Sequence, residues 1–313
     1  MLTNNTDSDQ ILIIAESEKE EYTCALKYLK NTNFIEDENS EKDKKERTGK
    51  LKKVLIANRG EIAKRFFMVL HEENIPSVAV VTDADRGQSW YEFADQVVYI
   101  GANENYTNIS IIIAAAVFSG ANAIYAGYGF LSENHKFVKR IKSVSQWLNT
   151  ELIFMGPKYE VMEIMGDKIS AREVAGKNGV PLFESSQALS DDDIEYVKKE
   201  AARIGYPVII KLSAGGGGKG MYPVFAEEEI TLAVQSTCRI GRDLYNDGSF
   251  YLEKFIQRPI HIEVQVFNGS AIGIRKCAVQ RRNQKIIEES GHTFLEDHQF
   301  MSFLSSAEKL VRA

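Results

Sequence analysis

A glycine-rich loop is the clearest sign of chemistry in this sequence. An apolar run typical of a buried strand, Pro207–Lys211, precedes the loop Ala214–Gly220. Glycine N–H groups can close on phosphate oxygens because no side chain intervenes, and a lysine adds positive charge. A flexible hairpin turn is the alternative, although such a turn needs only about one or two glycines. The candidate phosphate-binding residues are Gly215, Gly216, Gly217, Gly218, Lys219, Gly220 and Met221.

Two common phosphate-binding motifs do not fit this loop. A Walker A motif requires Lys-Ser or Lys-Thr after its last glycine, and neither dipeptide follows here. A Rossmann fingerprint opens a helix, whereas the next segment, Tyr222–Phe225, is typical of a strand.

Two charged residues lie within predicted strands near this loop. Lys211 ends an apolar strand and is costly to bury without an anionic partner, which a phosphate could supply. The alternative is a solvent-facing lysine on a sheet edge. Glu253 lies in the alternating run Leu252–Ile256, where it could accept a hydrogen bond from an amine or a sugar hydroxyl while the neighbouring backbone reads an adenine edge. Any amphipathic strand has a similar pattern.

Further polar residues cluster towards the C-terminus. His261, Glu263 and Gln265 share one face of a predicted strand, which indicates either a lined cleft or a half-exposed sheet. The segment Gln280–Lys285 is densely cationic and suits anion binding, with a basic surface loop as the alternative.

A second glycine-containing segment, Gly127–Asn134, lies between a predicted strand and a predicted helix. Ligands of doubly wound sheets bind at the carboxyl ends of strands, where this segment would lie. Alternatively, Ser132 and the residues after it simply cap the next helix.

The elements that must position these residues predict two kinds of sheet. Short apolar runs alternate with helical segments from residue 51 to residue 157, which predicts a doubly wound, Rossmann-like parallel sheet. Residues 158–313 are predicted to form a second, α+β unit, in which the stretches 250–256, 261–267 and 271–279 alternate as in an antiparallel sheet. The expected fold class is therefore α/β followed by α+β.

Composition excludes several classes of protein. The chain has 313 residues, 44% of them apolar and 26% charged, as in a soluble globular protein. Its net charge of -6 argues against nucleic-acid binding. Cys24, Cys238 and Cys277 form no Cys-x-x-Cys pair, which argues against a disulfide framework or a zinc site. No apolar run approaches the roughly 20 residues of a membrane span, and no signal peptide is recognisable, so a cytoplasmic protein is expected.

Residues 1–50 differ in composition from the rest of the chain. They carry 12 Asp/Glu and 8 Lys/Arg, a net charge of -4. The spacing of Tyr22, Leu26 and Leu29 predicts one helix within Glu16–Leu29, and the following charged run is typical of a solvated linker or, less often, a partner-binding segment. We therefore expect residues 1–50 to be an extension that the fold does not need.

Taken together, the motifs resemble those of biotin carboxylases, the ATP-grasp subunits or domains of acetyl-CoA, propionyl-CoA and pyruvate carboxylases. The resemblance covers residues 52–290; carbamoyl-phosphate synthetases are similar in fold, but their motifs fit less well. It implies a biotin carboxylase N-terminal domain at 51–157 and an ATP-grasp domain at 158–313, with the glycine-loop lid at about 183–255. The matching segments are Asn58–Ala63, Gly127–Asn134, Met165–Lys168, Lys211–Met221, His261–Val266 and Gln280–Lys285.

The resemblance implies an ATP-dependent ligase that carboxylates biotin with bicarbonate through carboxyphosphate. Its implied partners are a biotin carboxyl carrier protein or domain, a carboxyltransferase and, in a homodimer, a second copy. Lys168 and Lys211 would contact phosphates beneath the glycine lid. In the same way, Lys285 would bind bicarbonate and Tyr128 would lie near biotin. The residues implied to hold the nucleoside are Glu253, Lys254 and Ile256 at the adenine, His261 at the ribose, and Gln280 along the nucleotide.

Three departures from the family pattern affect the expected activity. Tyr125-Ala126 replaces the usual His-Pro, and Asn283 replaces a histidine. In the family, the glutamates that hold Mg²⁺ or Mn²⁺ follow the last residue of this sequence. We therefore expect a C-terminally incomplete biotin carboxylase that is inactive alone and lacks its metal ligands. A non-catalytic nucleotide-binding relic is the alternative.

Overall fold

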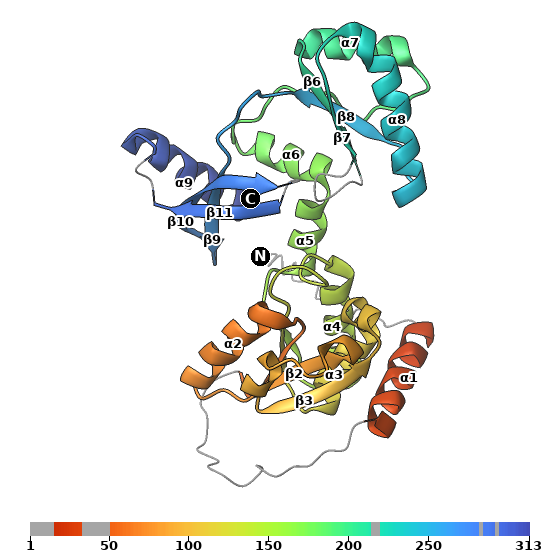
Figure 1. Ribbon diagram of the computed structural model, residues 1–313, viewed down its shortest axis with the longest axis vertical. Coiled ribbons are helices and arrows are strands. Elements are labelled where there is room, and N and C mark those ends of the chain that lie inside the picture. Colours follow the sequence, from red (N-terminus) through yellow and green to blue (C-terminus); the bar gives the residue numbers. More distant parts are fainter. Residues whose placement is uncertain (1–15, 33–50, 214–219, 282–283, 292–293) are drawn as a thin grey trace, which may run out of the picture. The chain divides into compact units, whose positions relative to one another are not determined.

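The computed structural model describes residues 16–32, 51–213, 220–281, 284–291 and 294–313 (Figure 1). Residues Ala214–Lys219, which include most of the glycine loop, and Asn283 lie outside this part. The chain divides into two compact units, Met1–Glu163 and Ile164–Ala313, and each is described by itself.

The first unit contains a five-stranded parallel sheet, as the alternation of strands and helices predicts. The strand order is β3-β2-β1-β4-β5. The order reverses between β1 and β4, and in such sheets the carboxyl ends at the reversal form the ligand-binding crevice. The strands are β1 (Val54–Ile56), β2 (Ser77–Thr82), β3 (Gln96–Gly101), β4 (Ala123–Tyr125) and β5 (Ile153–Phe154).

Helices bury both faces of this sheet. Alternate residues of β1 point to opposite sides: Leu55 packs with α3, whereas Val54 and Ile56 pack with α2. A parallel strand covered on both faces must be apolar throughout, which explains the unbroken hydrophobic character of β1. The helices of this unit are α2 (Gly60–Glu72), α3 (Ile109–Phe118) and α4 (His135–Trp147), and the 3-10 turns are Asp83–Asp85, Trp90–Phe93 and Asn103–Thr107.

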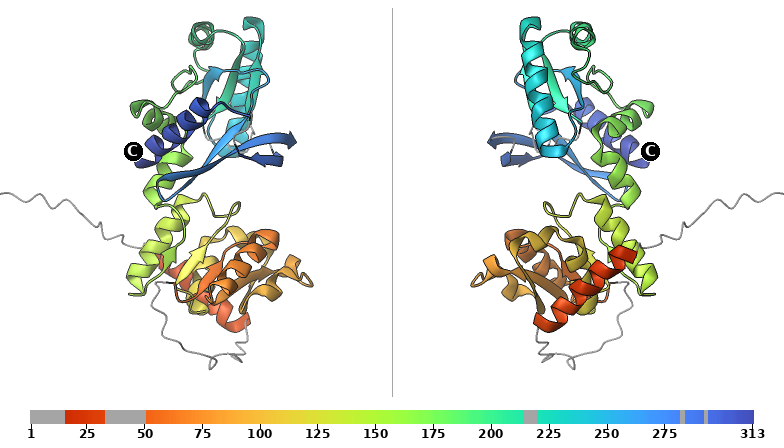
Figure 2. Two further views of the ribbon diagram at one scale, coloured as in Figure 1. Left: turned by 90° about the vertical axis from the view of Figure 1, so that its left-hand side faces the viewer. Right: turned by 90° about the vertical axis from the view of Figure 1, so that its right-hand side faces the viewer.

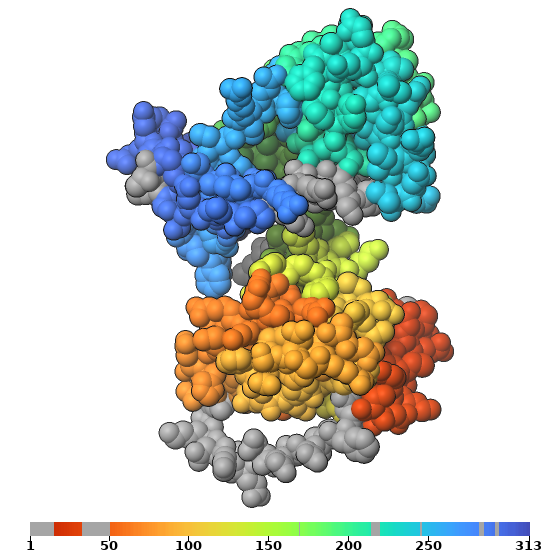
Figure 3. Space-filling model, viewed as in Figure 1, coloured from red at the N-terminus to blue at the C-terminus, as the bar shows by residue number. Residues whose placement is uncertain are grey.

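The N-terminal helix α1 (Glu16–Thr32) packs against α3 (Figure 3). Tyr22 is 2% exposed and Leu29 is fully buried, and both belong to the same hydrophobic cluster as α3. Glu18 forms an ion pair with Arg140 on α4. The predicted helix is therefore confirmed. Its apolar stripe adds to the core beside α3, a docking that the expectation of an extension not needed by the fold did not include.

Replacing Leu29 by alanine is expected to lower the free energy of unfolding by about 2–4 kcal/mol, because a fully buried leucine leaves a cavity. Urea denaturation measures this change. The neighbouring exposed residue Lys30 supplies the control variant Lys30→Ala, which should stay close to the parent. Equal midpoints for the two variants would show that α1 does not dock.

The second unit contains two antiparallel three-stranded sheets, with strand orders β7-β6-β8 and β11-β10-β9. The antiparallel pattern predicted after residue 250 is thereby confirmed for β9 and β10. The strands are β6 (Val208–Leu212), β7 (Met221–Val224), β8 (Phe250–Lys254), β9 (Ile262–Phe267), β10 (Ser270–Arg281) and β11 (Gln284–Ser290). The helices are α6 (Lys168–Lys177), α7 (Ile194–Ile204), α8 (Glu227–Tyr245) and α9 (Asp297–Arg312); α5 (Tyr159–Gly166) crosses the boundary between the units.

One face of the β7-β6-β8 sheet is covered and the other carries charge. Val208 and Ile210 of β6 are fully buried in one hydrophobic cluster with residues of α7 and α8. The α8 helix lies along this sheet in Figure 2. Because side chains alternate along a strand, Ile209 and Lys211 point to the opposite face.

The α9 helix packs against β9 and β10 of the other sheet. Among the described residues, no helix is long and apolar enough to span a membrane.

Candidate functional site

A buried carboxylate organises the charged face of the β7-β6-β8 sheet. Glu253 on β8 has a side chain that is only 7% exposed, and it accepts from Lys211 Nζ at 2.5 Å and from Arg172 Nη1 at 3.0 Å. Lys211 and Glu253 share a face because β6 and β8 pair antiparallel with Ile209 opposite Glu253. Burying a carboxylate is costly unless it is paired, and here two cations share it.

Arg172 also links β8 to residues 183–185. Its Nη2 donates to Phe183 O at 2.6 Å and to Ser185 Oγ at 2.9 Å. Arg172 was not among the residues singled out from the sequence. It could have been predicted from its position one helical turn after Lys168, since residues four apart on a helix share a face.

Lys168 is the first residue of α6, whose N-terminus is capped by Asp167. Burial and the positive charge of Lys211 lower the pKa of Lys168, and the negative charge of Glu253 partly opposes them. Lys168 thus adds a third positive charge near the carboxylate that Arg172 and Lys211 bind. Such an arrangement attracts an anion with several oxygens, such as a polyphosphate.

Backbone hydrogen bonds hold both described ends of the glycine loop. Leu212 N donates to Gly220 O at 3.2 Å, and Ser213 N donates to Ser249 O at 3.0 Å. Gly220 has a φ of +74°, and a Cβ there would lie 2.2 Å from Leu212 Cδ1, so glycine is required. The prediction that the loop joins two strands is confirmed for β6 and β7.

The three residues implied to bind adenine, Glu253, Lys254 and Ile256, have different surroundings. Lys254 Nζ donates to Gly205 O at 2.8 Å and to Tyr206 O at 3.1 Å, so its ammonium group fastens a loop. Ile256 is exposed. Both carboxylate oxygens of Glu253 are engaged by cations, which leaves its assignment to adenine a prediction.

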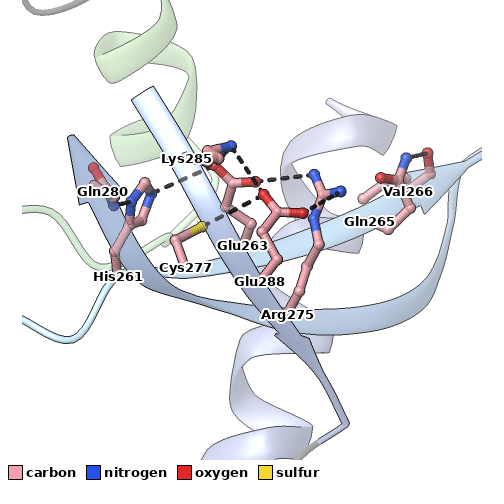
Figure 4. Close-up of polar contacts among 9 residues, drawn as sticks. All are labelled: His261, Glu263, Gln265, Val266, Arg275, Cys277, Gln280, Lys285 and Glu288. Carbon is pink, nitrogen blue, oxygen red and sulfur yellow. Dashed lines mark hydrogen bonds and ion pairs between the residues drawn. The ribbon is translucent and has the colours of Figure 1, made fainter. Parts of the chain in front are cut away.

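A second polar cluster lies on the β11-β10-β9 sheet (Figure 4). Glu263 pairs with Lys285, with Arg275 Nη2 at 2.9 Å and with His261 Nε2 at 3.5 Å. Burial alone would raise the pKa of Glu263, but the hydrogen bond from Lys285 and the neighbouring positive charges outweigh it and hold the pKa below its ordinary value. Glu263 therefore stays ionised and holds Lys285 in place.

Gln280 and Gln265 take different positions relative to this cluster. Gln280 Nε2 lies 2.8 Å from His261 Nδ1, so the two residues implied to lie along the nucleotide are in contact. Gln265 Nε2 donates to its neighbour Val266 O at 3.5 Å and lies apart from the others in Figure 4. The structure thus unites His261 with Glu263 and Gln280, but not with Gln265.

In the first unit, Asn58 joins the carboxyl ends of β1 and β4. Its fully buried side chain donates from Nδ2 to Ala126 O at 2.7 Å and to Tyr128 O at 2.8 Å. Tyr128 is 64% exposed and donates to Glu61 Oε1 at 2.9 Å, and this hydrogen bond raises the pKa of Tyr128. Asn134 caps α4, so the segment also has the capping role that the alternative interpretation predicts.

Replacing Gly127 by alanine is expected to destabilise the protein more than replacing Gly129. Both glycines have positive φ, +66° and +76°, but only at Gly127 would a Cβ meet other atoms, with Ile62 Cγ2 at 2.6 Å and Asn58 Nδ2 at 3.1 Å. The difference between Gly127→Ala and Gly129→Ala should be about 1–3 kcal/mol in the free energy of unfolding, measured by urea denaturation. Equal losses would mean that Asn58 and Ile62 do not hold this loop.

Comparison with known families matches both parts of the chain. The family model of the biotin carboxylase N-terminal domain matches residues 50–162. The family model of the carbamoyl-phosphate synthase L chain ATP-binding domain matches residues 167–313.

Two curated relatives show the extent of the similarity. The chain is 41% identical over 248 residues to a biotin carboxylase of Haemophilus influenzae, an alignment that covers 77% of this chain and 54% of the relative. It is 40% identical over 253 residues to the propionyl-CoA carboxylase alpha chain of Ruegeria pomeroyi, covering 78% of this chain and 36% of the relative. The chain thus spans about half the length of the first of these relatives and about a third of the second.

Two solved structures have the same fold over most of the chain. A biotin carboxylase from Campylobacter jejuni, described as a β,γ-ATP complex, is 40% identical with a TM-score of 0.76, covering 84% of this chain and 59% of that one. The biotin carboxylase domain dimer of 2-oxoglutarate carboxylase from Hydrogenobacter thermophilus, described with MgADP, ADP and bicarbonate, is 37% identical with a TM-score of 0.75, covering 84% and 58%.

Proposed function

Because the chain belongs to the biotin carboxylase family, we propose that it forms the nucleotide-binding part of an ATP-dependent ligase that carboxylates biotin with bicarbonate. The observation that carries this proposal is the gathering of three cations, Lys168, Arg172 and Lys211, near the carboxylate of Glu253. This charge lies on the sheet whose hairpin carries the glycine loop.

Each positive group has a distinct part in the proposed nucleotide site. Arg172 holds Glu253 in place, so that Lys211 is positioned by an ion pair before a nucleotide arrives. Phosphate oxygens then take further hydrogen bonds from Lys211 and Lys168. An anion beside Lys168 also offsets the repulsion from Lys211 that lowers the pKa of Lys168.

The remaining roles follow the family pattern. The glycine loop would cover the phosphates, Glu253 and Ile256 would border adenine, and Lys254 would fix the start of that segment through Gly205 and Tyr206. His261 and Gln280, which contact each other, would lie along the ribose and the nucleotide. Lys285 would bind bicarbonate after exchanging its contact with Glu263, and Tyr128 would lie near biotin.

Glu253, the one carboxylate that the proposal assigns to the nucleotide site, has both oxygens engaged by cations, so it is not assigned to magnesium or manganese. Those ions prefer sets of oxygen ligands. In the described part of the chain, one group of three potential ligands lies together, and it combines the imidazole of His261 and the thiol of Cys277 with the carboxylate of Glu263. We therefore assign no magnesium ligand among the residues that the structure describes and derive no step through the ion.

A carrier protein or domain that bears biotin, and a carboxyltransferase, are the proposed partners. The support is that relatives of this chain are named as subunits or chains of propionyl-CoA and pyruvate carboxylases. Homodimerisation is a further proposal, supported by the relative described as a domain dimer.

Calorimetric titration of the chain with ATP tests the central proposal. Binding of one ATP per chain is expected without biotin or bicarbonate, because the charged face is already assembled. Inorganic phosphate alone should bind far more weakly, since it reaches only part of that face. Absence of ATP binding by folded protein would contradict the proposed function.

A further inference from the structure

The β11-β10-β9 sheet brings four potential metal ligands onto one face. Cys277 N donates to His261 O at 2.9 Å, which places these residues opposite each other, and Arg275 is opposite Glu263. Cys277 is also opposite Glu288 on β11. Opposite residues of an antiparallel pair, and residues two apart on a strand, share a face. The register therefore gathers His261, Glu263, Cys277 and Glu288.

The donor atoms of three of these residues are close enough to share one ion. The ligand atoms of His261, Glu263 and Cys277 all lie within 4.8 Å of one another. Tetrahedral zinc, with bonds of about 2.0–2.3 Å, places its ligand atoms about 3.5 Å apart, so small side-chain rotations are sufficient. Glu288 Oε1 lies 3.9 Å from Cys277 Sγ and can supply the fourth donor.

The kinds of donor select the kind of ion. Imidazole and thiolate suit zinc and cadmium, whereas magnesium and calcium require oxygen sets. We propose that His261, Glu263, Cys277 and Glu288 form a binding site for a thiophilic divalent cation such as Zn²⁺ or Cd²⁺, which competes with the ammonium group of Lys285 for Glu263. Because Lys285 is proposed above to bind bicarbonate, the cation would also change that region; only this consequence rests on the proposed function.

Competition follows from the contacts of Glu263. Lys285 occupies Oε1 of Glu263 and lies 3.8 Å from Glu288 Oε1. Arg275 binds the other oxygen of each carboxylate, Glu263 Oε2 at 2.9 Å and Glu288 Oε2 at 3.3 Å. A bound cation thus takes the oxygens that Lys285 leaves, while Arg275 keeps both carboxylates oriented. A protonated Lys285 beside the cation would be repelled.

Two proton adjustments accompany binding. Burial raises the pKa of the Cys277 thiol, with Glu263 and Glu288 acting in the same direction and Lys285 and Arg275 opposing them. The thiol nevertheless releases its proton to solvent on binding, because zinc and cadmium bind the thiolate. Gln280, now 2.8 Å from His261 Nδ1, can turn its amide so that oxygen accepts from Nδ1–H, which leaves the Nε2 lone pair for the cation.

Cadmium titration of the whole chain tests this site, because a cadmium–thiolate bond has its own ultraviolet absorption band. The exposed Cys24 is first replaced by serine, since it could bind cadmium by itself. In this Cys24→Ser protein we expect one cadmium per chain, with the band present and with zinc displacing cadmium. Either His261→Ala or Cys277→Ser should weaken binding by at least about 10–100-fold.

The variant Lys285→Ala tests whether the cation competes with the ammonium group of Lys285 for Glu263 or simply binds the thiol of Cys277. Removing the competing ammonium group should strengthen cadmium binding, whereas Lys276→Ala, an equal charge change at a residue paired with Glu289, should have a smaller effect. Circular dichroism checks that each variant is folded. A band that survives Cys277→Ser, no band in the Cys24→Ser protein, or unchanged affinity in Lys285→Ala would overturn the proposal. The readout needs no enzymatic activity, so its failure leaves the proposed nucleotide site untouched.

Discussion

The double variant Lys168→Ala, Lys211→Ala is expected to bind ATP at least about 100-fold more weakly than the parent chain. A hydrogen bond to a charged group contributes about 1.5–3 kcal/mol, and each 1.4 kcal/mol corresponds to roughly a tenfold change in affinity. Two such contacts are lost together. Calorimetry with ATP at fixed ionic strength measures the change.

The fold should survive this double substitution. Glu253 keeps its bond to Arg172 at 3.0 Å, so the buried carboxylate is not left without a cation. Lys198→Ala provides the matched control, because Lys198 lies on α7, where it pairs with Glu195. The control should bind ATP as the parent does. Unchanged affinity in the folded double variant would refute the assignment of the phosphates to this face.

The second large effect concerns turnover. We expect the 313-residue chain alone to show no biotin-dependent release of phosphate from ATP in the presence of bicarbonate. The proposed nucleotide site offers no free carboxylate to the metal that phosphoryl transfer uses, because both oxygens of Glu253 are engaged by Lys211 and Arg172. Losing one preorganised transition-state contact typically lowers the rate by about 10²–10³-fold.

A phosphate-release assay with and without biotin measures this expectation. The complete biotin carboxylase of Haemophilus influenzae, a relative of this chain, is the positive control. If the chain does release phosphate when biotin is added, and Lys285→Ala abolishes that release while Lys276→Ala does not, then the chain completes the reaction and the expectation is wrong.

Local periodicity was sufficient to predict the architecture. The parallel sheet of residues 51–157 and the antiparallel strands after residue 250 follow from apolar runs and from period-two alternation, which depend only on neighbouring residues. The helix that contains Tyr22 and Leu29 was predicted for the same reason. Its docking on α3 was not, because the partner surface is formed by residues about 80–100 positions later in the chain.

The candidate site was likewise predicted only in part from the sequence. The sequence by itself identified Lys211 as a cation in need of an anionic partner and grouped His261 with Glu263, because burial cost and strand alternation are local properties. Only the tertiary structure decided that the partner of Lys211 is Glu253, shared with Arg172, and that Glu263 holds Lys285.

The physical reason is that ion-pair partners depend on strand register and helix packing. Lys211 meets Glu253 because β6 pairs with β8 in one register, and Cys277 meets both His261 and Glu288 because β10 pairs with strands on both sides. A shift of one residue would turn every one of these side chains to the other face. Residue types and spacing therefore determined which groups carry charge, and the fold determined which of them touch.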